Sequence, residues 1–132
     1  PDQALAPSTL PVALQQAIAR LHTWGSAMAA ADTAGRKRMA GAHADIYQKS
    51  TPTSSEDFAH GRNGTWYVRT KADGFSERFT KHEDDEMYEK SRGGHVVEAL
   101  VSDGRTSVYR KYNDAGVLVE SVEKRDGPIE PR

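Results

Sequence analysis

The sequence contains no cysteine, and this absence excludes disulfide bonds and thiolate metal sites. It has no apolar run near the roughly 18 residues that a membrane-spanning helix needs. Its formal net charge is -1, whereas nucleic-acid-binding proteins usually carry a strong basic excess. We therefore expect neither a membrane span nor a nucleic-acid partner.

Familiar catalytic and cofactor motifs are also missing. The chain has no G-x-S-x-G, no P-loop, no G-x-G-x-x-G and no H-E-x-x-H sequence. No two of its 5 histidines stand four residues apart, the spacing that places two imidazoles on one helix face. We expect no cofactor and no metal ion, and on balance no catalytic activity.

The chain is long enough for one domain with its own core. It has 132 residues, of which 36% are hydrophobic and 28% charged. We expect tails over residues 1–8 and 127–132 and a single α+β domain over residues 9–126. The Pro- and Ala-rich start, which carries no Met, leads us to expect a mature periplasmic or secreted protein whose signal peptide has been removed.

Helical periodicity dominates the first third of the chain. Between Leu10 and Ala31, the apolar residues Leu14, Leu21 and Met28 recur every seven positions and share one helix face. After a break, the spacing favours a short second helix within residues 36–49, although this stretch also has features of a strand start. We expect a helical part over residues 9–50 and a loop over residues 50–64.

From residue 65 the hydrophobic period changes to two, which is typical of strands. Four short turn sequences separate the strand-like segments: Asp73-Gly74, Gly93-Gly94, Asp103-Gly104 and Asn113–Gly116. They predict a meandering antiparallel sheet of about six strands over residues 65–125. One face of this sheet is expected to pack against the long helix and the other to face water.

A two-residue turn at Asp73-Gly74 fixes the expected register of the first of these hairpins. It pairs Val68 with Phe79 and puts both residues on the face that carries Trp66. It also places Arg69 opposite Arg78 on the other face, where like charges destabilise a ladder unless an anion is near. If no neighbouring glutamate neutralises them, Arg69, Lys71 and Arg78 form a basic platform, our first candidate for a ligand or partner site.

The second candidate site is the acidic segment Glu83, Asp84, Asp85 and Glu86, which follows His82. Carboxylates bind Ca²⁺ or Mg²⁺, but adjacent side chains on an extended segment point to opposite faces. We therefore interpret the segment as an acidic turn that is suited to a basic partner and not as a metal site.

The order of elements is similar to that of the nuclear-transport-factor-2-like superfamily. The residues that carry this likeness are Trp24–Asp32, which precede a second helix, and the ending Tyr112–Glu120. The resemblance implies N-terminal helices in the concavity of a curved antiparallel sheet. The resemblance implies no catalytic residue, because the Asp/His pair that this superfamily often has in its pocket cannot be matched to residues of this sequence.

Three functions are compatible with these patterns. The first is an exported, non-enzymatic binding domain with a protein or small-molecule partner. The second is a pocketed domain that binds or transforms a small apolar molecule between helix and sheet, with Trp24, Trp66 and Phe79 in the pocket wall. The third is an inhibitor or immunity-type protein whose acidic segment binds a basic partner.

Overall fold

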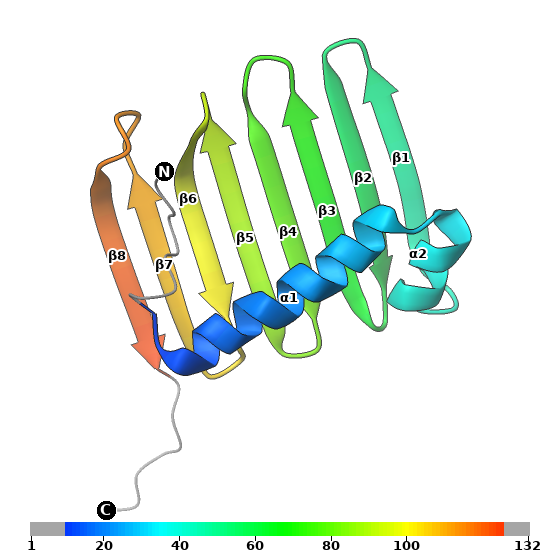
Figure 1. Cartoon of the computed structure of the whole chain (residues 1–132), viewed down its shortest axis with the longest axis horizontal. Helices are drawn as coiled ribbons and strands as arrows, with labels where there is room; N and C mark the ends of the chain where they lie inside the picture. Colours follow the sequence, from blue (N-terminus) through cyan, green and yellow to red (C-terminus); the bar gives the residue numbers. More distant parts are fainter. Residues whose placement is uncertain (1–9, 126–132) are drawn as a thin grey trace, which may run out of the picture.

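The computed structural model describes residues 10–125, which form two helices and one open antiparallel sheet of 8 strands (Figure 1). The strands follow one another in the sheet in the order of the sequence, so every connection is a hairpin. The two expected tails lie outside the described residues. The elements are α1 (Val12–Ala30), α2 (Thr33–Ala40), β1 (Asp45–Thr51), β2 (Ser54–Gly61), β3 (Gly64–Lys71), β4 (Ser76–His82), β5 (Asp85–Arg92), β6 (His95–Ser102), β7 (Thr106–Tyr112) and β8 (Leu118–Arg125).

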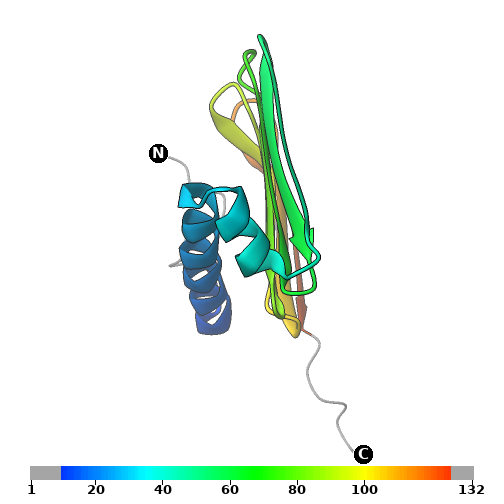
Figure 2. The same cartoon turned by 90° about the vertical axis from the view of Figure 1, so that its right-hand side faces the viewer.

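The long N-terminal helix is confirmed. It buries Leu14, Leu21 and Met28, the residues of the seven-residue repeat, together with Ala17. In Figure 1 it crosses in front of the sheet, from the β7 side towards β2. Figure 2 shows that both helices lie on the same side of the sheet, which forms one open layer and does not close around them. We call the side that carries the helices the inner face and the other side the outer face.

The second helix is also present, but it ends earlier than the spacing predicts. Its N-terminus is capped by Asp32, whose Oδ1 accepts a hydrogen bond of 2.8 Å from the backbone N–H of Gly35. Gly41 follows its last residue with a φ of 133°, a value that favours glycine, and stops the helix. Strand β1 begins at Asp45, so residues 36–49, whose sequence is compatible with a helix or a strand start, contain the end of α2 and the start of β1.

The prediction of a loop over residues 50–64 is wrong, because most of this stretch belongs to the hairpin of β1 and β2. This hairpin adds two strands to the expected six, so the sheet has 8 strands. Apart from the buried Ala59, the side chains of these two strands are exposed or half-buried. Their sequence therefore lacks the alternation of apolar and polar residues by which a strand is recognised.

The expected register of the β3–β4 hairpin is wrong by one residue. The backbone N–H of Lys71 donates to the carbonyl of Phe75 at 2.9 Å, which closes a three-residue loop with Gly74 at a φ of 92°. Val68 consequently pairs with Arg78 and Arg69 with Glu77. A slip of one residue exchanges the faces of a strand, so Phe79 lies on the outer face and Arg78 on the inner one.

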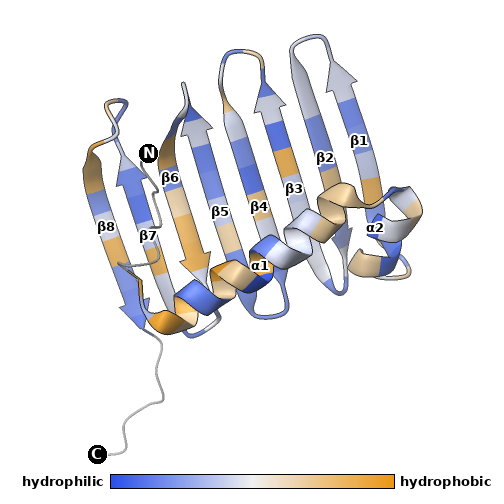
Figure 3. Ribbon diagram, in the orientation of Figure 1, coloured by the Kyte–Doolittle hydropathy of each residue, from blue (hydrophilic) through white to orange (hydrophobic). Residues whose placement is uncertain are grey.

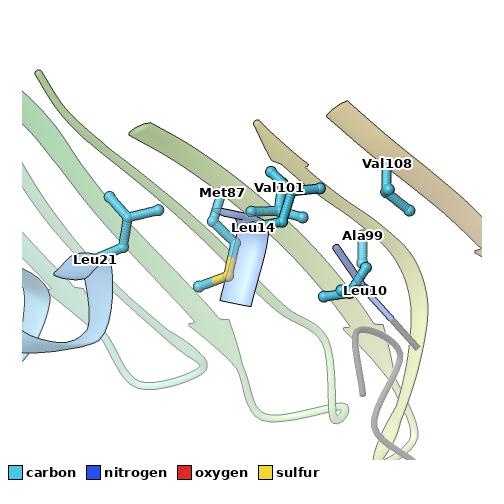
Figure 4. Packing of buried hydrophobic residues seen from close by; sticks show 7 residues of the cluster. All are labelled: Leu10, Leu14, Leu21, Met87, Ala99, Val101 and Val108. Atoms are coloured by element: carbon cyan, nitrogen blue, oxygen red, sulfur yellow. The ribbon is translucent and has the colours of Figure 1, made fainter. Parts of the chain in front are cut away.

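The core fills the space between α1 and the inner face in two clusters. One cluster joins Leu14 and Leu21 of α1 to Met87, Val101 and Val108 of the sheet (Figure 4). The hydrophobic segments of β6 and β7 lie where the first half of α1 crosses them (Figure 3). The other cluster surrounds Met28 and Trp66 near α2. Between the two clusters the helix and the sheet leave a hollow.

Candidate functional site

The hollow has a volume of about 370 Å³ and opens between α1 and the middle strands of the inner face. Pockets for small molecules usually have volumes of about 300–1,000 Å³. We call it the trough. It is lined by Leu21, His22, Gly25, Ser26 and Ala29 of α1, Arg36 of α2, Asp57 of β2, Trp66 and Val68 of β3, Arg78 and Thr80 of β4, and Met87 and Glu89 of β5.

The apolar wall of the trough comes from neighbouring strands. Trp66 is 5% exposed and Met87 8% exposed, so both are held rigidly by the packing around them. Gly25 of α1 faces Thr80 and Trp66, and a Cβ there would lie 3.9 Å from the Thr80 side chain. The missing side chain of Gly25 therefore keeps the trough open beneath the helix.

One end of the trough is closed by Arg36. Its Nε donates a hydrogen bond of 3.0 Å to the carbonyl of Met28, which ties α2 to the end of α1. Its guanidinium lies 4.8 Å from the ring centroid of Trp66, a distance that allows a cation–π interaction. Arg36 Nη1 also lies 3.5 Å from Oδ1 of Asp57.

Asp57 carries the least satisfied polar atom of the trough. Its Oδ1 is buried and forms an ion pair with Arg36, but within residues 10–125 no donor makes a hydrogen bond with it. A buried carboxylate oxygen without a donor is costly, so such atoms usually have a partner, either in the protein or in something bound to it. Asp57 therefore has a buried oxygen that can accept a hydrogen bond from a bound molecule.

Arg78 and Glu89 form the opposite polar wall. They are joined by a charge-assisted hydrogen bond of 2.6 Å between Arg78 Nη2 and Glu89 Oε1. The trough thus carries two cations and two carboxylates, and its formal charge is balanced.

The basic platform expected from the sequence is not formed. Arg78 lies on the inner face in the trough, whereas Arg69 and Lys71 lie on the outer face, where their cationic groups are 5.8 and 5.3 Å from the ring of Phe75. Glu77 stands opposite Arg69 in place of the second arginine. The three residues therefore do not form one surface.

The acidic segment is divided as well. Asp85 is 6% exposed and accepts two hydrogen bonds from Arg20 of α1, at 2.7 and 3.0 Å. Glu83 and Asp84 form the exposed turn between β4 and β5, and Glu86 lies on the outer face opposite Lys81. One of the four carboxylates thus holds the helix to the sheet and is not available to a partner.

Of the three aromatic residues that we expected in a pocket wall, one is found there. Trp66 lines the trough. Trp24 instead stacks on His82, with ring centroids 4.8 Å apart, and Phe79 lies on the outer face because of the register.

The outer face carries two rows of side chains that run across all 8 strands. The first, which we call the apolar row, contains one residue from each strand. Its members are Tyr47, Phe58, Tyr67, Phe79, Tyr88, Leu100, Tyr109 and Val122. The second, which we call the charge row, lies beside it and alternates in sign from strand to strand. Its members are Lys49, Glu56, Arg69, Glu77, Lys90, Glu98, Lys111 and Glu120.

Both rows correspond to a repeat in the sequence, which the two-residue hydrophobic period does not reveal. Each copy of the repeat consists of Glu-x-apolar, then eight residues, then Tyr-x-Lys/Arg. The copies begin at Glu56, Glu77 and Glu98, at intervals of 21 residues. A half repeat at Tyr47 precedes these three copies, and another half repeat at Glu120 follows them. A comparison of the chain with itself would have revealed this signal.

The two rows are joined by hydrogen bonds that the repeat reproduces. The hydroxyls of Tyr67, Tyr88 and Tyr109 donate to Glu56, Glu77 and Glu98 at 2.7, 2.6 and 2.5 Å, respectively.

These bonds shift the pKa of their members. Burial and the nearby carboxylate of Glu56 raise the pKa of Tyr67 to about 12. The bond to Glu98 raises the pKa of Tyr109 to about 12, and the same bond lowers the pKa of Glu98.

Comparison of the chain with protein-family models, curated proteins and solved structures gave no match. Within residues 10–125, no helix is long and apolar enough to cross a membrane. The same part of the chain contains no cluster of three or more histidine and carboxylate side chains that could hold a metal ion.

Proposed function

We propose that the protein is a non-enzymatic binding domain that holds a small molecule in the trough between α1 and the sheet. The observation that carries this proposal is the buried Oδ1 of Asp57, which lies without a hydrogen bond in a hollow of about 370 Å³ beside Trp66. An apolar wall with a few convergent polar groups is the usual composition of a ligand site.

The lining defines the chemistry of the ligand. Trp66, Val68 and Met87 offer a surface for a flat or branched apolar body. The carboxylate of Asp57 offers an acceptor for an N–H or O–H donor, and a positively charged amine makes the stronger, charge-assisted bond. The proposed ligand is therefore a small aromatic or aliphatic amine.

The first test compares two probes that share a ring and differ in charge. Tryptamine carries an ammonium group on an indole, and indoleacetate carries a carboxylate on the same ring. Titration of the ¹⁵N-labelled full chain, followed by amide chemical shifts, should show saturable binding of tryptamine and at least about tenfold weaker binding of indoleacetate. Equal binding of both probes, or of neither, would contradict the proposal.

A pair of helix variants locates the binding without disturbing the core. Ala29 is exposed on α1 and lines the trough, so Ala29→Phe should fill its mouth and abolish tryptamine binding. Ala27 is also exposed but is not part of the lining, and Ala27→Phe should bind as the wild type does. If both variants bind equally well, the ligand does not occupy the trough.

The role of Asp57 is tested by Asp57→Asn, which keeps the shape of the side chain and removes its charge. Tryptamine binding should weaken about tenfold or more, because a charge-assisted hydrogen bond becomes a neutral one. Circular dichroism establishes that the variant is folded. Unchanged affinity in a folded variant would show that another group receives the amine.

A further inference from the structure

The outer face is a second feature that calls for a partner, and it is separate from the trough. None of the described helices covers it, because α1 and α2 both lie on the inner face (Figure 2). The apolar row crosses this face from Tyr47, which is 46% exposed, to Val122, which is 38% exposed. We propose that the outer face is the interface of a symmetric homodimer, in which two copies of the chain pack sheet on sheet.

The size of the face fits such an interface. Eight strands spaced about 4.8 Å apart, each about 26 Å long, present a surface of roughly 1,000 Å². Stable interfaces bury about 800 Å² on each partner. One outer face is therefore large enough to bind another without a contribution from the helices.

The order of charges selects a second copy as the partner. In a two-fold arrangement with the axis parallel to the strands, β1 faces β8 of the second copy, β2 faces β7, and so on. Because the charge row alternates in sign over an even number of strands, each member then faces an opposite charge. Lys49 faces Glu120 of the second copy, and Glu77 faces its Lys90.

Two observations support this pairing independently. Lys49 and Glu120, at the two ends of the charge row, form no ion pair within residues 10–125, so both are available to a second copy. A third row lies on the other side of the apolar row, and its four Asp, Glu and Lys members also face opposite charges. There Asp45 faces Lys124 of the second copy, and Lys81 faces its Glu86.

The apolar row supplies the attraction and the charged rows supply the register. The two-fold axis sets Tyr47 against Val122 of the second copy and Phe79 against its Tyr88. The hydroxyl of Tyr88 is already bonded to Glu77 of its own chain, so its ring can be buried without leaving a donor unpaired. Opposite charges that flank an apolar strip mainly determine which arrangement forms.

Two double variants test this arrangement at its edges. Residues 47 and 122 lie on the first and last strands, seven strands apart within one chain, but face each other across the proposed interface. Tyr47→Lys with Val122→Glu places opposite charges there, whereas Tyr47→Lys with Val122→Lys places like charges there. The two variants differ at one exposed position, so both should fold equally well.

Sedimentation equilibrium of the full chain, from micromolar to millimolar concentration, gives the outcome. The wild type should reach twice the chain mass of 14.5 kDa. The Lys/Lys variant should dissociate at least about tenfold more readily than the Lys/Glu variant. A wild type that stays monomeric throughout would overturn the proposal, and so would two variants with equal dissociation constants. Equal dissociation constants are also expected if the two-fold axis ran along the rows, perpendicular to the strands. Residue 47 would then face residue 47 of the second copy in both variants.

Discussion

The hydrogen bonds between the two outer rows make a quantitative prediction about stability. In Tyr88→Phe, the ring keeps its place in the apolar row, but the 2.6 Å bond to Glu77 is lost and a half-buried carboxylate loses its donor. Hydrogen bonds to charged groups contribute about 1.5–3 kcal/mol. Because Tyr88 is only half-buried, we expect a loss near the lower end, about 1.5 kcal/mol, which corresponds to a fall in Tm of about 6 °C.

The repeat itself provides the control for this measurement. Tyr47 occupies the same position of the repeat, but it lies on the edge strand β1, so no earlier strand offers it a glutamate. Its hydroxyl forms no hydrogen bond with any other residue of the described chain, and Tyr47→Phe should change the free energy of unfolding by less than about 0.5 kcal/mol.

Urea unfolding followed by circular dichroism measures both variants. A double-mutant cycle with Glu77→Gln should assign about 1 kcal/mol to the Tyr88–Glu77 pair. The reasoning is refuted if Tyr47→Phe and Tyr88→Phe lower the free energy of unfolding equally, or if Tyr88→Phe costs nothing.

Other parts of the structure give further predictions. Leu14 is fully buried beneath α1, so Leu14→Ala should cost about 2–5 kcal/mol in urea unfolding; a loss below about 1 kcal/mol would mean that the helix is not packed as described. A Cβ at Gly64 would lie 2.3 Å from the carbonyl oxygen of Lys81, so Gly64→Ala should cost about 2 kcal/mol or more, and a neutral effect would argue against this close approach. Burial and the bond to Glu56 raise the pKa of Tyr67, and the bond to Glu98 raises that of Tyr109, so both protonated phenols stabilise the fold fully below pH 10 and lose this contribution as the pH rises through about 12. Alkaline titration of tyrosinate absorbance should therefore show at least two tyrosines that ionise well above the ordinary value of 10; ionisation of all tyrosines near 10 would contradict the bonds.

The parts of the fold that could be predicted are those in which one element buries one face. The seven-residue repeat of Leu14, Leu21 and Met28 predicted α1 because these residues pack on the sheet together. The β1–β2 hairpin could not be predicted in the same way, because its side chains are mostly polar on both faces. Its position in the sheet is set by backbone pairing with β3, which leaves no hydrophobic period in the sequence.

The candidate site was harder to predict for a related reason. Arg36, Asp57 and Arg78 are each 21 residues apart in the chain, and only the meander and the second helix bring them together. The face on which Arg78 lies depended on whether Ala72 belongs to a strand or to the loop, a difference of one residue. Turn residues alone did not decide this point, because Asp-Gly occurs in both two-residue and three-residue loops.

The rows of the outer face were in principle readable from the sequence. They extend over all 8 strands and recur once every two strands, so they appear as a 21-residue period and not as the two-residue period of a strand. Half of their members are charged, which hides them from any search for hydrophobic residues alone.

The most direct test of the proposed function is the detection of intermolecular nuclear Overhauser effects between bound tryptamine and the protein. The trough predicts contacts from the indole ring to the side chains of Trp66 and Met87, and from the methylene protons of the ethylammonium chain to β2 near Asp57. Contacts with Tyr or Phe side chains of the outer face, with none to Trp66, would contradict the account.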